Sequence, residues 1–157
     1  MKENGDESTQ ATESTREVWL NRMSVTGLTV SEEPTPENVP SPNEAMRSVS
    51  NWEVQPVSKV PLSHPDAHQE VDRQWYAQAT QAGLFSEDGS FLLSISGSGS
   101  SGFGWAAVKW NPTVELTSRL ARESEGLDFV AMSEDGRTVC AVTEEEYDYW
   151  IVVQHLR

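Results

Sequence analysis

The sequence predicts an all-β fold built from repeated antiparallel units. Two observations lead to this prediction. A segment of strand, turn and strand occurs twice without a gap, and a β-rich segment follows each copy. Because regular periods of about 40 to 50 residues are typical of stacked structural units, the repeat takes precedence over other interpretations of the chain.

The amino-terminal part is expected to divide into a tail and a folded region. Residues 1–16 are almost entirely polar, so they bury too little surface to offset the entropy of ordering, which predicts a disordered acidic and polar tail. Apolar residues arrive in quick succession from Glu17 to Val30, which predicts one or two strands. Residues 32–43 and 56–74 contain several prolines and are predicted to be extended surface connections.

The repeat lies in the carboxy-terminal half of the chain. Residues 84–96 align with residues 131–143 at an offset of 133 minus 86, or 47 residues. Each copy holds a short apolar strand, an Asp-Gly turn whose glycine can take a positive φ, and a second strand. We expect further strands at 105–110 and 149–154 after the copies, and at 114–120 between them.

Four strands per period of this length form the blade of a β-propeller. A third match, over residues 41–55, places blade-like repeats near 41–79, 80–125 and 126–157. We therefore expect residues 17–157 to form a partial β-propeller-like array of about three four-stranded antiparallel blades. Because propellers close with about four to eight blades, open sheet edges would remain and favour self-association or pairing with another chain.

The two Ser-Glu-Asp-Gly turns, at 86–89 and 133–136, resemble the turn between the first two strands of a blade in the WD-repeat β-propeller family. Residues 108–111 resemble the end of that family's third strand, with Asn111 in place of the signature aspartate. The family's Gly-His and Trp-Asp pairs do not occur, and a glycine-serine insertion lengthens the loop after Ile95. The resemblance implies a divergent, scaffold-like protein that binds other proteins.

Charge restricts the classes of partner. The chain carries 25 acidic and 11 basic side chains for a net charge of −14, which opposes binding to nucleic acid and to anionic membranes. The amino terminus lacks the apolar core of a secretory signal, and no run of about 18 apolar residues occurs. Cys140 has no partner for an internal disulfide, so we expect an intracellular, cytoplasmic protein, with a nuclear location left open.

The candidate partner-binding residues are turn carboxylates and one aromatic pair. They are Glu87, Asp88, Glu134, Asp135, Glu144, Glu145, Glu146, Asp148, Trp75 and Tyr76. Equivalent turns of a repeat project on the same side, so their carboxylates are expected to form a surface for a basic protein. The aromatic pair follows a proline-containing segment and is expected to be an exposed binding hot spot.

Two motifs suggest chemistry. The glycine-rich loop Gly97–Gly104 satisfies a GxGxxG pattern, but a strand follows where a dinucleotide site needs a helix, which favours a flexible hairpin loop. His64 and His68 are spaced for one helix face, with Asp66 between them, but a structural zinc site needs four ligands. These patterns favour a solvated polar linker over a metal site.

We therefore predict a non-catalytic protein–protein interaction scaffold with no cofactor and no metal. Two alternatives stay open. One is a small β-rich enzyme or ligand-binding domain that uses the Gly97–Gly104 loop or the His64 and His68 pair, and the other is a truncated propeller fragment without independent function.

Overall fold

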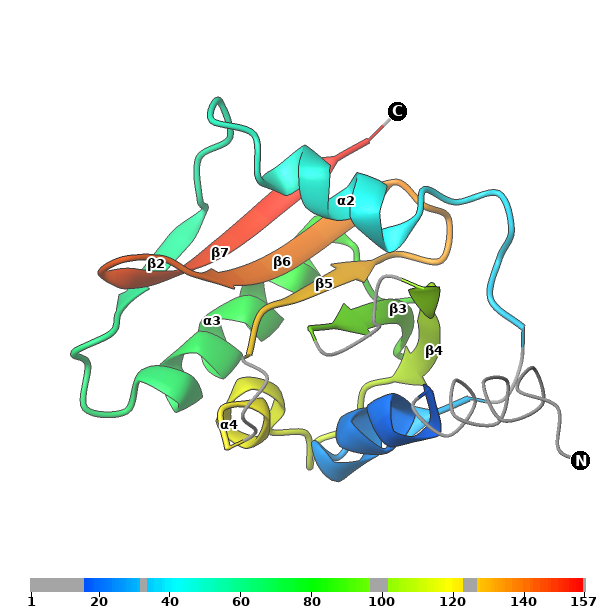
Figure 1. Ribbon diagram of the computed structural model, residues 1–157, viewed down its shortest axis with the longest axis horizontal. Helices are drawn as coiled ribbons and strands as arrows, with labels where there is room; N and C mark the ends of the chain where they lie inside the picture. The colour runs from blue at the N-terminus through cyan, green and yellow to red at the C-terminus, as the bar shows by residue number, and fades with distance from the viewer. Residues whose placement is uncertain (1–15, 32–33, 97–101, 123–126, 157) are drawn as a thin grey trace, which may run out of the picture.

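The computed structural model describes residues 16–156 apart from 32–33, 97–101 and 123–126 (Figure 1). Its centre is a seven-stranded antiparallel sheet in the order β1-β4-β3-β5-β6-β7-β2. The strands are β1 (Thr29–Val30), β2 (Ser58–Pro61), β3 (Ser90–Ile95), β4 (Ala106–Lys109), β5 (Phe129–Met132), β6 (Thr138–Glu144) and β7 (Asp148–His155). The helices are α2 (Pro42–Val49), α3 (Ala67–Ala82) and α4 (Leu116–Leu120), preceded by helical residues 16–25.

The antiparallel, β-rich part of the prediction is confirmed, but the arrangement of the strands differs from the one expected. The strands assigned to separate four-stranded blades lie side by side in one open sheet, within the described residues. Helices cover both faces of this sheet. Residues 1–15 of the predicted tail lie outside the part of the chain that the structure describes.

The two faces of the sheet bury different residues. Phe91 and Leu93 face a core that includes Trp75 of α3, whereas Leu92 and Val130 face a smaller core that includes Ala45 of α2. Figure 1 shows α2 on one side of β5, β6 and β7 and α3 on the other. Because both faces are covered, successive residues of β3 and β5 are buried, instead of every second one.

The strands predicted near residues 90–96, 105–110, 131–132, 137–143 and 149–154 are confirmed as β3 to β7. Residues 84–85, predicted to be the first strand of the repeat, are not in a strand. The segment 17–30 is helical up to residue 25 and holds only the two-residue strand β1, and α4 occupies most of the segment 114–120. In the first of these helices, Trp19 and Met23 are buried four residues apart, a helical spacing on one face.

The segments predicted to be the third repeat and the surface connection 56–74 both contain helical residues, and the local sequence explains each case. In α2, which replaces the third repeat, the Ser41 hydroxyl accepts a bond from the Glu44 backbone N–H, and the Glu44 carboxylate accepts one from the Ser41 N–H. This capping box, with Pro42 in the first turn, starts a helix. The predicted connection 56–74 contains β2 and the beginning of α3 instead, because Val71, Trp75 and Ala79 form a buried stripe with helical spacing.

A partly buried carboxylate joins α3 to α4. The Asp72 carboxylate accepts hydrogen bonds from the Thr117 backbone N–H at 2.7 Å and from the Thr117 hydroxyl at 2.6 Å. It therefore occupies the place of a helix cap that the residue before α4, Glu115, does not supply through its side chain. Burial raises the pKa of Asp72 above its usual range, and the hydrogen bonds from Thr117 and Ser118 act in the opposite direction.

The edges of the sheet are short. One edge strand, β1, has two residues, and the other, β2, has four residues and ends at Pro61, which has no backbone donor. Short, proline-bearing edges restrict pairing with another sheet. None of the helices in the described segments is long and apolar enough to cross a membrane.

Candidate functional site: an acidic–aromatic groove

An open groove of about 660 Å³ lies at one end of the sheet, where the end of α3 and the turn that follows it meet the residues after β4. We call it the acidic–aromatic groove and define it by Tyr76, Phe85, Glu87, Asp88 and Trp110. Its lining is completed by Thr80, Ser86, Gly89, Asn111 and Pro112. Three of the ten candidate partner-binding residues lie in it.

Helix α3 places neighbouring aromatic residues in two different environments. Trp75 belongs to the stripe that faces the sheet and is 1% exposed, so the prediction that it forms an exposed pair with Tyr76 is wrong. The Trp75 indole N–H points to the Cys140 carbonyl at 3.4 Å, at the limit of a hydrogen bond. Tyr76, one residue further around the helix, is 41% exposed and lines the groove.

The other two rings of the groove belong to residues that follow a helix or a strand. Phe85 comes directly after α3, and its ring meets the Trp75 and Phe91 rings nearly edge-on, at 88° and 87°. Trp110 follows β4, and its backbone N–H donates to the Gly89 carbonyl at 3.0 Å. Trp75, which is buried outside the groove, packs against the rings of both Phe85 and Trp110, and this leaves their remaining surface available to a ligand.

The three groove rings form one continuous aromatic surface. The centroid of Tyr76 lies 4.9 Å from that of Trp110 and 5.5 Å from that of Phe85, and Phe85 lies 5.9 Å from Trp110. These separations are typical of directly packed aromatic rings. Phe85 and Trp110 are half-buried, so their outer surfaces continue that of Tyr76.

Carboxylates border this aromatic surface. Glu87 and Asp88 are exposed at the turn that begins the groove. Hydrogen bonds from Ser90 first, and then Lys109, hold the pKa of Asp88 below its usual range, so this carboxylate is charged at neutral pH. The Lys109 ammonium lies 3.3 Å from the Asp88 carboxylate, in a pair whose side chains are both about half-exposed.

The second Ser-Glu-Asp-Gly turn lies beside the first. Because β3 and β5 are antiparallel neighbours, the turn before β3 and the turn after β5 are at the same end of the sheet. The Ser86 hydroxyl donates to the Glu134 carboxylate at 2.5 Å. Glu134 and Asp135 are both exposed, so they extend the negative surface next to the groove.

The remaining candidate carboxylates are at the opposite end of β6. Glu144, Glu145, Glu146 and Asp148 belong to the hairpin between β6 and β7. The strand β6 runs from Thr138 next to the second turn to Glu144, a span of roughly 20 Å at the rise of an extended chain. Burial first, and then Glu144 and Glu145, raises the pKa of Asp128, whose carboxylate accepts a hydrogen bond from the Glu144 N–H.

The other exposed aromatic side chains are not near the acidic–aromatic groove. Trp52 is 87% exposed and Tyr147 is 74% exposed. Trp52 lines a small pocket with Glu145 and Trp150, beside the hairpin between β6 and β7. The structure therefore exposes Trp52 at this surface, whereas the sequence predicted an exposed tryptophan at residue 75.

The histidine pair has local partners. His64 precedes α3, and its Nδ1 accepts a hydrogen bond from the Asp66 backbone N–H. His68 lies in the first turn of α3, with Nε2 3.1 Å from the Tyr149 hydroxyl. Within the described residues, no three His, Cys, Asp or Glu side chains are grouped as metal ligands would be. Five residues of the Gly97–Gly104 loop, 97–101, lie outside the described part.

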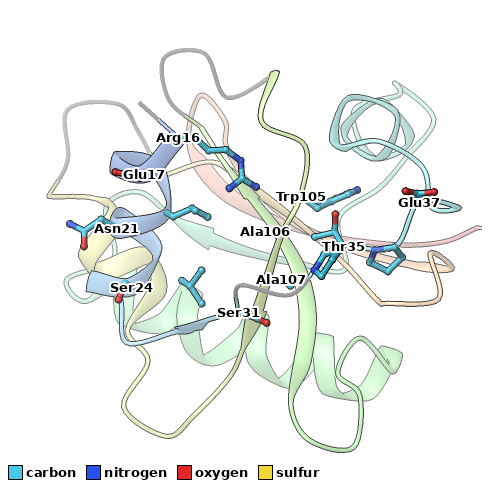
Figure 2. Close-up of a pocket in the computed structure, with 14 residues that line it drawn as sticks. Arg16, Glu17, Asn21, Ser24, Ser31, Thr35, Glu37, Trp105, Ala106 and Ala107 are labelled. Carbon is cyan, nitrogen blue, oxygen red and sulfur yellow. The ribbon is translucent and has the colours of Figure 1, made fainter. Parts of the chain in front are cut away.

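A cavity of about 980 Å³ lies elsewhere, between helical residues 16–25, β4 and residues 34–37 (Figure 2). Arg16, Asn21 and Ser24 are on its helical side in Figure 2, and Thr35 and Glu37 are on the opposite side. These polar groups do not form a cluster of one charge.

Sequence reasoning did not find Phe85 and Trp110. Phe85 falls in a predicted strand of the repeat and Trp110 at the end of the predicted strand 105–110, and neither is among the candidate partner-binding residues. The signal that groups them with Tyr76 is their contact in space, which has no periodic or motif counterpart in the sequence. Comparison with protein-family models, curated proteins and solved structures found no match for this chain.

Proposed function

We propose that this protein is a non-catalytic protein–protein interaction module that binds a basic segment of another protein in the acidic–aromatic groove. One observation carries the proposal: three packed aromatic rings and the Glu87 and Asp88 carboxylates line the same open groove. Aromatic side chains supply much of the binding energy at protein interfaces, and carboxylates give the surface its charge complementarity. The net charge of −14 adds long-range attraction to a basic partner.

A binding measurement with two matched charge variants tests this function. The probes are fluorescent peptides, one basic with mixed lysine and arginine and one acidic of equal length. We expect the basic peptide alone to bind, and the double variant Glu87→Gln with Asp88→Asn to weaken its affinity by about 10-fold. The control variant, Glu145→Gln with Glu146→Gln, removes the same charge from the far hairpin and is expected to change affinity less than about twofold.

Equal losses in the two double variants would contradict a defined site, because they would show that net charge alone attracts the peptide. Absence of binding by the basic peptide would overturn the proposal. Measurement at two salt concentrations separates the contributions, since long-range attraction is screened by salt more than contact with the rings is.

The enzyme or ligand-binding alternative is tested by thermal shift. A cofactor or metal that binds the folded state stabilises it by an amount that grows with the logarithm of its concentration above Kd. Stabilisation by ATP, NAD or zinc would overturn the non-catalytic module. Self-association through sheet edges and membership of the WD-repeat family stay predictions; light scattering after size exclusion tests the former.

A further inference from the structure

A basic segment can present two common cationic side chains to the acidic–aromatic groove, arginine and lysine. We infer that the groove's ligand is an arginine side chain of the basic segment, in preference to lysine. This inference rests on the proposed function, because it names the chemical group that the groove recognises.

The packing of the rings is the first reason. The centroids of Tyr76, Phe85 and Trp110 are 4.9–5.9 Å apart, with interplanar angles of 32–54°. Rings this close touch one another, so they leave no space between them in which an ammonium could be surrounded. They present a broad outer surface instead. A planar guanidinium stacks on such a surface and is more weakly hydrated than an ammonium, so it loses less on leaving water.

The neighbouring carboxylates are the second reason. Glu87 and Asp88 are consecutive exposed residues at the border of the aromatic surface. A stacked guanidinium keeps its N–H donors in the plane of the group, where they can reach a carboxylate at the edge of the rings as a two-bond pair. A lysine ammonium contacts a carboxylate as a point charge and gains less from the ring surface.

The existing ion pair does not block this contact. Lys109 lies 3.3 Å from Asp88, but its side chain is 48% exposed and that of Asp88 is 58% exposed. Exposed pairs of this kind are weak, so an incoming guanidinium can replace Lys109. Glu87, which has no ion pair among those found in the described residues, is an acceptor that needs no such replacement.

The test compares two peptides of identical length and charge, one with arginine and one with lysine at every basic position. Affinities are measured by fluorescence anisotropy on the full chain. We expect the arginine peptide to bind about 5- to 10-fold more tightly. Affinities within twofold of each other would overturn the arginine inference and leave the proposed function standing. Failure of both peptides to bind would overturn both.

Two variants that each remove one aromatic ring test whether the groove causes the preference for arginine. Trp110→Leu and Tyr76→Leu each keep an apolar side chain but remove a ring, so we expect the ratio of arginine to lysine affinities to fall toward one. Tyr76 is 41% exposed, so its variant keeps the test valid if Trp110→Leu does not fold by circular dichroism. Trp52→Leu, at an exposed tryptophan outside the groove, is the matched control and is expected to keep the ratio. A ratio that persists in both groove variants would overturn the assignment to this site.

Discussion

The two Ser-Glu-Asp-Gly turns have the same four residues and the same local geometry but different surroundings. In each turn the glycine N–H donates to the serine carbonyl at 2.9 Å, and the aspartate accepts a bond at 3.0 Å from the N–H two residues later. The glycines have positive φ angles, 87° at Gly89 and 75° at Gly136. Local sequence therefore determines the turns.

The surroundings of the two turns differ because different elements precede them in the chain. Four apolar residues, Phe129–Met132, precede the second turn and form β5, which pairs with β6 in a hairpin. The positions before the first turn are taken by the end of α3, so only Gly83, Leu84 and Phe85 separate helix from turn. The first turn consequently lies beside α3 and its aromatic residues, whereas the second lies against Val39 and Pro40. A repeated motif is not sufficient to give a repeated tertiary environment.

The largest expected effect concerns the core beneath the first turn. Trp75 packs against Phe85, Phe91, Trp110 and Phe129, so we expect Trp75→Ala to lower the free energy of unfolding by about 3–5 kcal/mol. Trp52→Ala, at an exposed site, is the control and is expected to change it by less than about 0.5 kcal/mol. Urea denaturation measures both. Similar losses in the two variants would contradict the burial of Trp75.

The two turn glycines sharpen the comparison. Alanine at a positive φ costs about 1–2 kcal/mol, which we expect for Gly89→Ala. Gly136→Ala is expected to cost more, because its Cβ would lie 2.9 Å from Val39 Cγ1. Only Gly89→Ala should also weaken binding of the basic peptide, since Trp110 is bonded to Gly89. Denaturation and anisotropy on the same variants check both statements, and a binding defect in Gly136→Ala alone would refute them.

The two turn serines differ in what their hydroxyls support. Ser133 is 5% exposed, donates to Asp135 and accepts from the Thr138 N–H, so Ser133→Ala leaves a buried donor without its partner. We expect a loss of about 1–2 kcal/mol. Ser86 donates to exposed Glu134, and its alanine variant is expected to lose less than about 0.5 kcal/mol. A larger loss at Ser86 in thermal or urea denaturation would reverse this assignment.

The smallest effect is the pH dependence that the two turns share. Hydrogen bonds hold the pKa of Asp88 and of Asp135 below the usual value of 3.8, with Ser90 and Ser133 as the largest causes. Each carboxylate stabilises the fold above its unfolded pKa, and the contribution is lost as pH falls through the lowered, folded pKa. We expect the double variant Asp88→Asn with Asp135→Asn to lose less stability than wild type between about pH 5 and pH 2. Urea denaturation measures both proteins. If wild type and the double variant lose the same stability as the pH falls, the hydrogen bonds to Asp88 and Asp135 contribute nothing to it.

Parts of the fold and of the site followed from the sequence because their causes are local. The Asp-Gly turns and the apolar runs around them predicted β3, β5 and β6, and the turn carboxylates were found as exposed residues. The capping box at Ser41 and the buried stripe through Trp75 were equally local, yet the prolines near them and the repeat pattern favoured loops and strands instead. That error placed Trp75 on the surface.

The sequence by itself determined where the chain turns, which runs are apolar and that the surface is strongly acidic, since these properties depend on neighbouring residues and composition. Only the tertiary structure decided that the strands share one sheet and that Tyr76, Phe85 and Trp110 meet. The physical reason is that their contact requires α3 to pack on the sheet and β4 to pair beside β3. Both arrangements are set by the burial of residues far apart in the chain.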